Sequence, residues 1–249
     1  MNSFLLVALG VLALALVVAV GVLAYRREQA RDQALRAWAA AGGWQLVDED
    51  DRWAQAFDGP PFGVGEDRRA QDVCTGTRGG YGELAFTYRY ATYRTVTSTG
   101  PNGQLTTTRQ REDHAFQVVA LRLPVVIGPV QVVPQGLGQR LLTAFGGQDV
   151  EIEHADFNRR QRVTAASPKL ATDLLGPRVV EQLLSHDEVS LRLADGWALA
   201  WTPGRLSGPS VDERLTLLRA VVDGVPRFVW VDHGHDPGTL QSPLRKEAP

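Results

Sequence analysis

An uninterrupted apolar run opens the chain. From Phe4 to Ala24 there are 21 residues without a charged side chain. A helix of this length rises about 31 Å at about 1.5 Å per residue, which matches the hydrocarbon core of a bilayer. Each charge at the centre of such a helix would cost on the order of 3 kcal/mol. The run therefore predicts a transmembrane anchor over residues 1–25 that contacts the lipid bilayer.

A cleaved signal peptide is the alternative interpretation of this run, with a small-x-small site at residues 19–21. No Lys or Arg precedes Phe4, however. The run also exceeds the roughly 7 to 15 residues of the hydrophobic region in a signal peptide. The pattern therefore favours an uncleaved anchor, and a lipoprotein signal is excluded because no cysteine lies near it.

The charges that flank the run predict an orientation. Four arginines follow it and no basic side chain precedes it: Arg26, Arg27, Arg31 and Arg36. The positive-inside rule then places the N-terminus outside and the globular part in the cytoplasm. Residues 26–43 continue a helical pattern that ends at Gly42-Gly43, which predicts a juxtamembrane helix. This helix either docks its last turns on the domain or is a partly solvated connector.

Alternating apolar and polar positions predict two half-buried strands, over residues 83–90 and 114–121. Antiparallel pairing keeps their apolar residues opposite each other, whereas a slip of one residue would bring Gln117 to the apolar face. The expected pairs are Leu84 with Ala120, Phe86 with Val118 and Tyr88 with Phe116.

The outer arms of this hairpin, residues 92–99 and 104–113, have strand propensity and almost no apolar face. Residues 101–103, Pro-Asn-Gly, supply the turn chemistry between them. We therefore expect the arms to project beyond the core. Such a hairpin is either a contact surface for a partner or a solvated loop.

The second half of the chain predicts three helices and several short strands. The helices are expected over residues 168–175, 177–184 and 210–224, the last opened by a capping box from Ser210 to Glu213. The strands are expected over residues 150–152, 159–165, 189–193, 197–201 and 228–231. A three-residue loop at 194–196 would set Leu191 and Leu193 on the same face as Leu199 and Trp201.

These patterns together predict an α+β fold, with an N-terminal transmembrane helix followed by a mainly antiparallel sheet and about three packed helices. The globular domain is expected over residues 44–233. Residues 234–249, rich in Pro, Gly and charge, predict a disordered tail. Helix and strand do not alternate as in dinucleotide-binding folds.

Composition narrows the classes of function. A net charge of -2 and a pI near 6.2 argue against nucleic acid as a partner. The single cysteine, Cys74, rules out an intramolecular disulfide framework, so packing alone must hold the fold. Only Lys169 and Lys246 are lysines among 26 basic residues, which is typical of a high-GC genome.

Candidate chemistry in the sequence is sparse. His233 and His235 alternate beside two carboxylates, but a metal site needs three or four rigid ligands, and this stretch opens the expected tail. Cys74 lacks the surroundings of a nucleophile. The acidic run at 48–51 lacks the ligand spacing of a calcium loop. The sequence therefore predicts no catalytic residue, no cofactor and no metal site.

The remaining candidates also have ordinary interpretations. The glycine pairs at 63–65 and 136–138 lack the other elements of a phosphate loop and predict turns. A dense basic patch, formed by Arg159, Arg160 and Arg162, suits anionic headgroups or a carboxylate partner. Strand alternation would divide it between two faces.

Four motifs stand out as a set: Gly59-Pro60-Pro61-Phe62-Gly63 with Arg68-Arg69-Ala70, Phe86-x-Tyr88-x-Tyr90, Phe157-Asn158-Arg159-Arg160, and Pro226-Arg227-Phe228-Val229-Trp230. In these motifs the chain resembles uncharacterised single-span membrane proteins of high-GC Gram-positive bacteria. The segment from residue 157 to 197 is also similar to a broader bacterial domain of unknown function. The resemblance supports the architecture and implies no known activity.

We therefore expect a membrane-anchored, non-enzymatic binding or scaffolding domain at the cytoplasmic face, with a protein partner. Two alternatives remain open. One is a hydrolase-like enzyme whose site is assembled from scattered Asp, His and Arg. The other is a ligand sensor with an apolar cavity lined by Trp197, Trp201 and Tyr88, residues that more commonly pack in a core.

Overall fold

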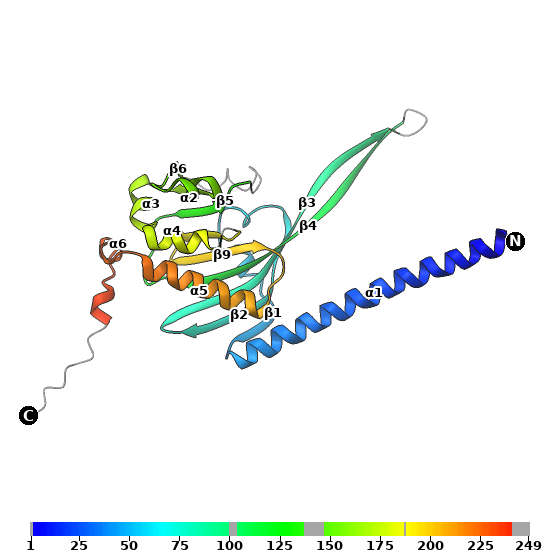
Figure 1. Cartoon of the computed structure of the whole chain (residues 1–249), viewed down its shortest axis with the longest axis horizontal. Helices are drawn as coiled ribbons and strands as arrows, with labels where there is room; N and C mark the ends of the chain where they lie inside the picture. Colours follow the sequence, from blue (N-terminus) through cyan, green and yellow to red (C-terminus); the bar gives the residue numbers. More distant parts are fainter. Residues whose placement is uncertain (1, 100–103, 137–146, 187, 241–249) are drawn as a thin grey trace, which may run out of the picture. The chain divides into compact units, whose positions relative to one another are not determined.

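The computed structural model describes the chain except for residues 1, 100–103, 137–146, 187 and 241–249, and it leaves the side chains of residues 2–9, 11, 99, 239 and 240 undescribed. The chain divides into two compact units, Met1–Trp44 and Gln45–Pro249. The first unit is one long helix, α1 (Asn2–Ala41) (Figure 1). Over the described residues, none of the helices has the length and apolar character needed to traverse a bilayer.

The end of α1 follows the predicted glycines. Gly43 adopts a left-handed backbone with φ of 68°, a conformation that glycine tolerates without strain. The Gly42 N–H donates to the Trp38 carbonyl and the Trp44 N–H donates to the Ala39 carbonyl, both over 2.9 Å. These bonds satisfy carbonyls of the last turn and end the helix.

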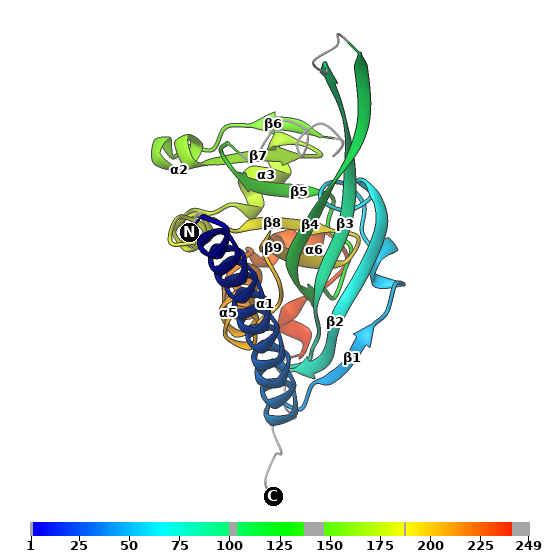
Figure 2. The ribbon, with the colours of Figure 1, turned by 90° about the vertical axis from the view of Figure 1, so that its right-hand side faces the viewer.

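The second unit is built on a nine-stranded sheet in the order β1-β2-β3-β4-β9-β8-β5-β7-β6 (Figure 2). Every strand pairing among the described residues is antiparallel. The strands are β1 (Gln45–Glu49), β2 (Glu66–Arg78), β3 (Tyr81–Thr99), β4 (Leu105–Arg122), β5 (Val130–Pro134), β6 (Gln148–Val150), β7 (Gln161–Ala165), β8 (Ser190–Ala194) and β9 (Trp197–Pro203). The predicted α+β class with a mainly antiparallel sheet is therefore confirmed.

Five α-helices accompany this sheet in the described part of the second unit, against about three expected. They are α2 (Ala155–Arg160), α3 (Pro168–Leu174), α4 (Pro177–Leu184), α5 (Gly208–Gly224) and α6 (Arg227–Asp232), with short 3-10 helices η1 (Trp53–Gln55) and η3 (Pro237–Leu240). Helix α3 begins as predicted, because the Ser167 side chain accepts the Leu170 N–H over 3.2 Å and Pro168 occupies the first turn.

The register of β3 and β4 is the predicted one, with Leu84 opposite Ala120, Phe86 opposite Val118 and Tyr88 opposite Phe116. The ladder continues without a shift to the pair Thr99 and Leu105. Other strands accompany it only part of the way, since the β2 pairing ends at Ala91 and the β9 pairing ends at Phe116. Beyond that point the two arms form a projecting ribbon (Figure 1). Its predicted turn at residues 101–103 lies outside the described residues.

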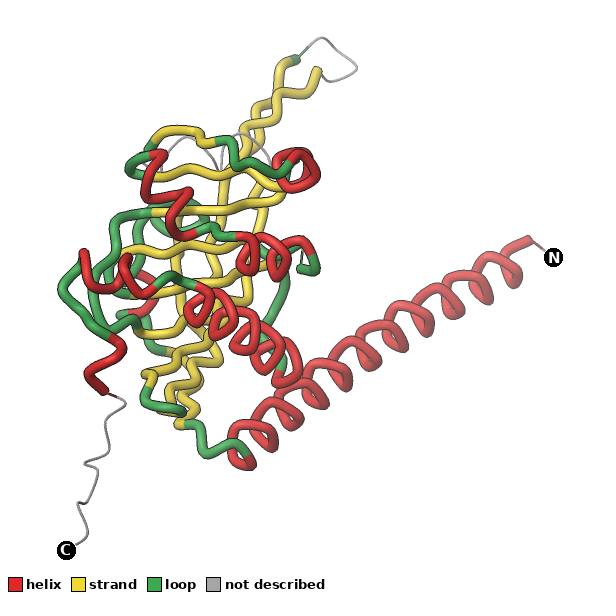
Figure 3. The backbone as a smooth tube through the Cα atoms, turned by 60° about the vertical axis from the view of Figure 1, so that its left-hand side comes forward, coloured by secondary structure: helices red, strands yellow, loops and turns green. Residues whose placement is uncertain are grey.

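Both faces of the sheet are covered at its centre. On one face α5 packs on β4 and β9 and lies beside α4 (Figure 3). On the other face Phe57 and Phe62, from the segment between β1 and β2, pack on Phe86 and Tyr88, with ring centroids 6.2 Å and 5.0 Å apart. Residues of β3 that point to either face are therefore buried.

The turn between β8 and β9 differs from the predicted loop. Its turn contains two residues, Asp195 and Gly196, both with positive φ, instead of three. This geometry is typical of a tight type I′ connection. Leu191 consequently pairs with Ala200, and Arg192 pairs with Leu199. Arg192 therefore shares the face of Leu199, where the prediction had placed Leu191 and Leu193. The predicted register was wrong by one residue.

Two expected strand segments are helical. Arg159 and Arg160 belong to α2, because His154 caps that helix by accepting the Phe157 N–H at Nδ1 over 3.2 Å, and Phe157 is buried. The expected strand at 228–231 is helix α6, which begins after Pro226. Helical spacing buries Trp230 and leaves Phe228 exposed.

The start of α5 also differs from the prediction. Helix α5 begins at Gly208, and Ser210 is not its cap but donates its hydroxyl to Gln117 Oε1 over 2.6 Å. After α6 the chain continues to η3, and Asp236, directly before η3, forms an ion pair of 2.7 Å with Arg227. Residues 241–249 lie outside the described part of the chain.

Candidate functional site

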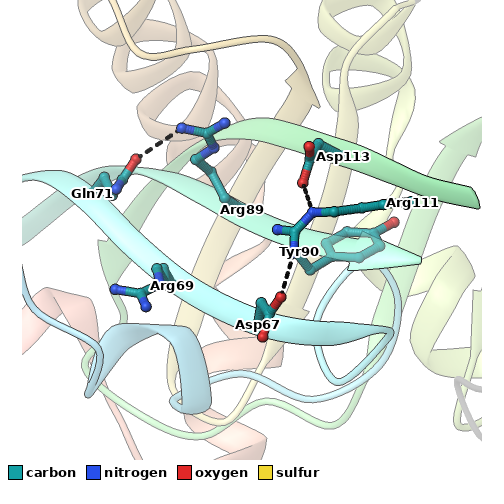
Figure 4. Close-up of a pocket in the computed structure, with 7 residues that line it drawn as sticks. All are labelled: Asp67, Arg69, Gln71, Arg89, Tyr90, Arg111 and Asp113. Carbon is teal, nitrogen blue, oxygen red and sulfur yellow. Dashed lines mark hydrogen bonds and ion pairs between the residues drawn. The ribbon is translucent and has the colours of Figure 1, made fainter. Parts of the chain in front are cut away.

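A polar hollow of about 450 Å³ lies at the base of the projecting ribbon, across β2, β3 and β4 (Figure 4). Arg89, Arg111 and Asp113 point to the face of the sheet that also carries Thr87, because they occupy alternate positions of the paired strands. The lining residues are Asp67, Arg69, Gln71, Arg89, Tyr90, Arg111 and Asp113.

Irregularities in β2 shape this hollow. The pairing of β2 with β3 shifts twice, between Glu66 and Arg69 and again between Gln71 and Cys74. Asp67 lies in the first irregularity and has a φ of 53°. Bulges of this kind redirect side chains out of the regular alternation of a strand. The Asp67 carboxylate thereby reaches Arg111, which lies 44 residues further along the chain.

Arg111 is held from two sides. Its Nη1 donates to Asp67 Oδ2 over 2.6 Å, and its Nε donates to Asp113 Oδ1 over 2.8 Å (Figure 4). Nη1 also donates to the Tyr93 hydroxyl over 3.2 Å. The hydrogen bonds that Arg111 donates to Asp113 and Asp67 raise its pKa above the ordinary value. This guanidinium is therefore charged, oriented and already neutralised by carboxylates.

The opposite end of the hollow carries Arg69 and Arg89. Arg69 Nη1 pairs with Glu49 Oε1 over 2.8 Å. Gln71 bridges the group, since its Nε2 donates to Glu49 and its Oε1 accepts from Arg89 Nη1, both over 3.3 Å. The hydrogen bonds from Gln71 and Arg69 lower the pKa of Glu49. This carboxylate is therefore ionised at neutral pH.

The ribbon continues the polar face away from the hollow. Arg109 stacks on the Tyr93 ring, 3.8 Å from its centroid, and pairs with Glu66 over 2.8 Å. Thr97 and Thr107 follow as a cross-strand pair. The side chains of residues 94–98 and 105–113 are exposed. The hollow and the ribbon thus form one continuous polar surface.

The chemistry of the hollow suits reversible binding. Its described lining combines fixed guanidinium, carboxylate and amide groups, which recognise ligands by hydrogen bonds and charge. Histidine, cysteine and serine are absent from that lining.

Cys74 is fully buried in β2, and its thiol lies 3.6 Å from the Asp72 carbonyl. Burial raises the pKa of Cys74 to about 12, and the Asp72 carboxylate adds to this shift. Such a thiol is a core residue and not a nucleophile.

His233 and His235 do not converge on a common point, because His233 Nδ1 contacts the Val229 carbonyl and the His235 ring packs against Trp230. The described residues contain no cluster of three or more metal-ligating side chains.

The acidic run at 48–51 is divided among different partners. Glu49 pairs with Arg69, Asp50 pairs with Arg52, and Asp51 accepts the Ala70 N–H. In the expected basic patch, Arg159 pairs with Asp156 and Arg162 pairs with Asp149. These contacts neutralise charges whose partners cannot be identified from the sequence alone. Residues 137 and 138 of the second glycine pair lie outside the described residues.

The aromatic residues considered for a ligand cavity belong to the core. Trp201, Tyr88 and Phe62 are buried together, with the Phe62 ring 5.0 Å from Tyr88 and 6.2 Å from Trp201. Trp197 is partly buried and packs edge-on against Phe57 at 6.0 Å. Their rings fill the space between the sheet and the segment that contains η1.

The sequence did not identify the residues of the hollow as a site. Their signal is weak, because it consists of charged residues at alternate positions, such as Arg109, Arg111 and Asp113, on a strand without an apolar face. The bulge that brings Asp67 to Arg111 has no recognisable local motif.

Comparison with known proteins gives one informative likeness. No family model matches the chain, and no curated protein matches it. Among solved structures, the fold of this chain is similar to the crystal structure of the mycobacterial trehalose monomycolate transport factor A, TtfA. The likeness has a TM-score of 0.54 at 16% identity and covers 77% of this chain and 92% of that chain.

Proposed function

We propose that this protein is a membrane-anchored, non-enzymatic binding factor that assists lipid transport by contacting another protein. The observation that carries the proposal is the fold likeness to a trehalose monomycolate transport factor, which extends over 92% of that chain. The hollow, whose described lining presents guanidinium, carboxylate and amide groups for hydrogen bonds, supports a binding role. Membership in the single-span membrane proteins that the chain resembles forms part of the same proposal.

The proposed anchor is the apolar run from Phe4 to Ala24, which is uninterrupted in the sequence. It belongs to the continuous helix α1. The apolar part of α1 whose side chains the structure describes is too short to traverse a bilayer, and the proposal therefore depends on residues 4–9, which complete the run in the sequence. Leu12, Leu14, Leu16 and Val17 of this helix are each at least 65% exposed, which suits a lipid environment better than water. We further propose that the arginines after the run retain the globular unit in the cytoplasm.

The proposed contact surface is the projecting ribbon of β3 and β4. Its arms are paired with each other and, over the described residues, with no further strand beyond Ala91 and Phe116. Unpaired strand edges are avoided in proteins unless a partner or a protective feature accompanies them. Val96 and Leu105 add exposed apolar side chains among the threonines of the arms. These features support a role in recognition.

A photo-cross-linking experiment in intact cells tests this function. We would place a photoreactive side chain at Thr97 on the ribbon and, as a matched control, at Thr172, which is exposed on α3. The proposal expects a reproducible adduct with a lipid-transport membrane protein from Thr97 and none from Thr172. Equal labelling from both positions, or no protein adduct from Thr97, would overturn it.

A shortened hairpin provides a second readout. Arg94 and Gln110 face each other in the ladder, so residues 95–109 can be replaced by Asn-Gly, which closes a tight turn between them. The variant should keep its fold and lose the partner. Full retention of the partner by the folded variant would exclude the ribbon as the contact surface.

A further inference from the structure

Arg89 is the least compensated charge of the hollow. Its side chain is half-buried, and one hydrogen bond of 3.3 Å joins its guanidinium to Gln71 Oε1. Among the residues that the structure describes, it forms no ion pair. A guanidinium carries five N–H donors, so most of the hydrogen-bonding capacity of Arg89 is available to a ligand.

Arg69 stands directly opposite Arg89 in the ladder between β2 and β3. Directly opposed side chains on one face have their Cβ atoms about 4.5–5.5 Å apart, and like charges in this arrangement destabilise the sheet. Glu49 offsets only one of the two charges. This end of the hollow therefore has a net charge of about +1 from Arg69, Arg89 and Glu49.

The carboxylates of the hollow lie at its other end. Figure 4 shows Gln71, Arg69 and Arg89 on one side and Arg111 between Asp67 and Asp113 on the other. Both aspartates are bound to Arg111, which reduces their repulsion of an anion. The volume of about 450 Å³ falls within the usual range of small-ligand sites.

From this geometry we propose that Arg69 and Arg89 together bind a phosphate oxyanion in the hollow. In Figure 4 the two guanidinium groups point away from each other, so both side chains turn toward the anion when it binds. Their planar forks match the oxygens of a phosphate, and an anion between them removes the cross-strand repulsion. Free phosphate and the phosphodiester of a lipid headgroup share this chemistry. The site does not depend on the proposed transport role, since a chain without a membrane anchor would still bind the anion.

Titration calorimetry on the detergent-solubilised full chain tests the site, at constant ionic strength. The probes are inorganic phosphate and glycerophosphoglycerol, which represent the free anion and a lipid headgroup. Arg89→Gln and Arg69→Gln remove the proposed ligands. Arg94→Gln makes the same change of charge on β3 at an exposed position of the opposite face and serves as the control.

We expect at least one probe to bind, and binding to weaken about tenfold or more in Arg89→Gln and Arg69→Gln but less than twofold in Arg94→Gln. The tighter probe identifies the source of the phosphate. Absence of binding by both probes, or equal weakening in all three variants, would overturn the proposal. If Arg89→Gln fails to fold, Arg89→Lys keeps the charge without the fork, and it should still bind more weakly than Arg94→Lys.

Discussion

Arg192 on β8 and Gln131 on β5 are paired across the sheet, and Arg192 Nε donates to Gln131 Oε1 over 2.8 Å. Arg192 is only 1% exposed. Its Nη2 donates to the Pro60 carbonyl over 2.6 Å, so the side chain ties the segment before β2 to the sheet. Burial lowers the pKa of Arg192 to about 10, which leaves it charged at neutral pH. One buried cation therefore helps to position the loop that supplies Phe62 to the core.

Replacing Arg192 by methionine should destabilise the fold strongly. The substitution keeps an apolar stem of similar length but leaves Gln131 Oε1 and the carbonyls of Gly59 and Pro60 without this donor. Each unsatisfied buried group costs about 1–3 kcal/mol, so we expect a loss of about 3–5 kcal/mol in the free energy of unfolding. Urea denaturation measures it, with Arg94→Met as the exposed control. A difference below about 1 kcal/mol between the two variants would contradict this role of Arg192.

Gly65 should be far less tolerant than Gly79, although both have positive φ. A Cβ atom on Gly65 would lie 2.5 Å from the Ala91 carbonyl oxygen, whereas nothing lies within 4 Å of one on Gly79. Both alanine variants bear the cost of a left-handed backbone, about 1 kcal/mol, and only Gly65→Ala adds the overlap, about 1–3 kcal/mol. Thermal unfolding of the two variants compares them directly. Equal losses of stability in the two variants would contradict this prediction, because they would mean that the backbone at Ala91 shifts at no cost to admit the Cβ atom.

Cys74 should resist alkylation in the folded protein. A pKa of about 12, against an ordinary value of 9.0, leaves on the order of a thousandfold less thiolate at any pH well below both. Iodoacetamide at pH 8 should therefore label the protein in urea but not under native conditions. Rapid native labelling would show that β2 opens readily or that the thiol is accessible.

Asp236 should titrate at unusually low pH. The Arg227 guanidinium and the Gly238 N–H lower its pKa to about 2 from an ordinary 3.8. Because the folded pKa is the lower one, the contribution to stability is complete above about pH 4 and disappears as the pH falls towards 2. Carboxyl carbon NMR measures the pKa, and Arg227→Gln should raise it towards 3.8. An unchanged pKa in that variant would assign the shift to Gly238.

Sequence periodicity was sufficient for the central hairpin. Leu84, Phe86 and Tyr88 alternate over a strand long enough that only one register keeps Gln117 off their face, and the structure has that register. The β8–β9 hairpin was predicted one residue out of register, because both strands are buried on two faces and their alternation does not distinguish them. There the two-residue turn decides the register, and its signal is the pair Asp195-Gly196, which is typical of a type I′ turn and which the predicted three-residue loop overlooked.

The hollow could not be predicted for a related reason. Its contacts join residues far apart in the chain, such as Asp67 with Arg111 and Glu49 with Arg69. They depend on the bulges of β2 and on the position of that strand beside β3. Local patterns encode the elements, whereas a site of this kind arises from their assembly. The proposed anchor is the opposite case, because it rests on one contiguous apolar run of the sequence.

Alkaline carbonate extraction of membranes tests the central claim, the anchor, most directly. The full chain is compared with a double variant, Leu14→Arg with Val18→Arg, in which two charges interrupt the run from Phe4 to Ala24. Each charge adds on the order of 3 kcal/mol to the cost of insertion. The account predicts that the full chain stays in the membrane pellet after extraction and that the double variant is released. Release of the full chain into the supernatant would contradict the anchor and the membrane-based role proposed for this protein.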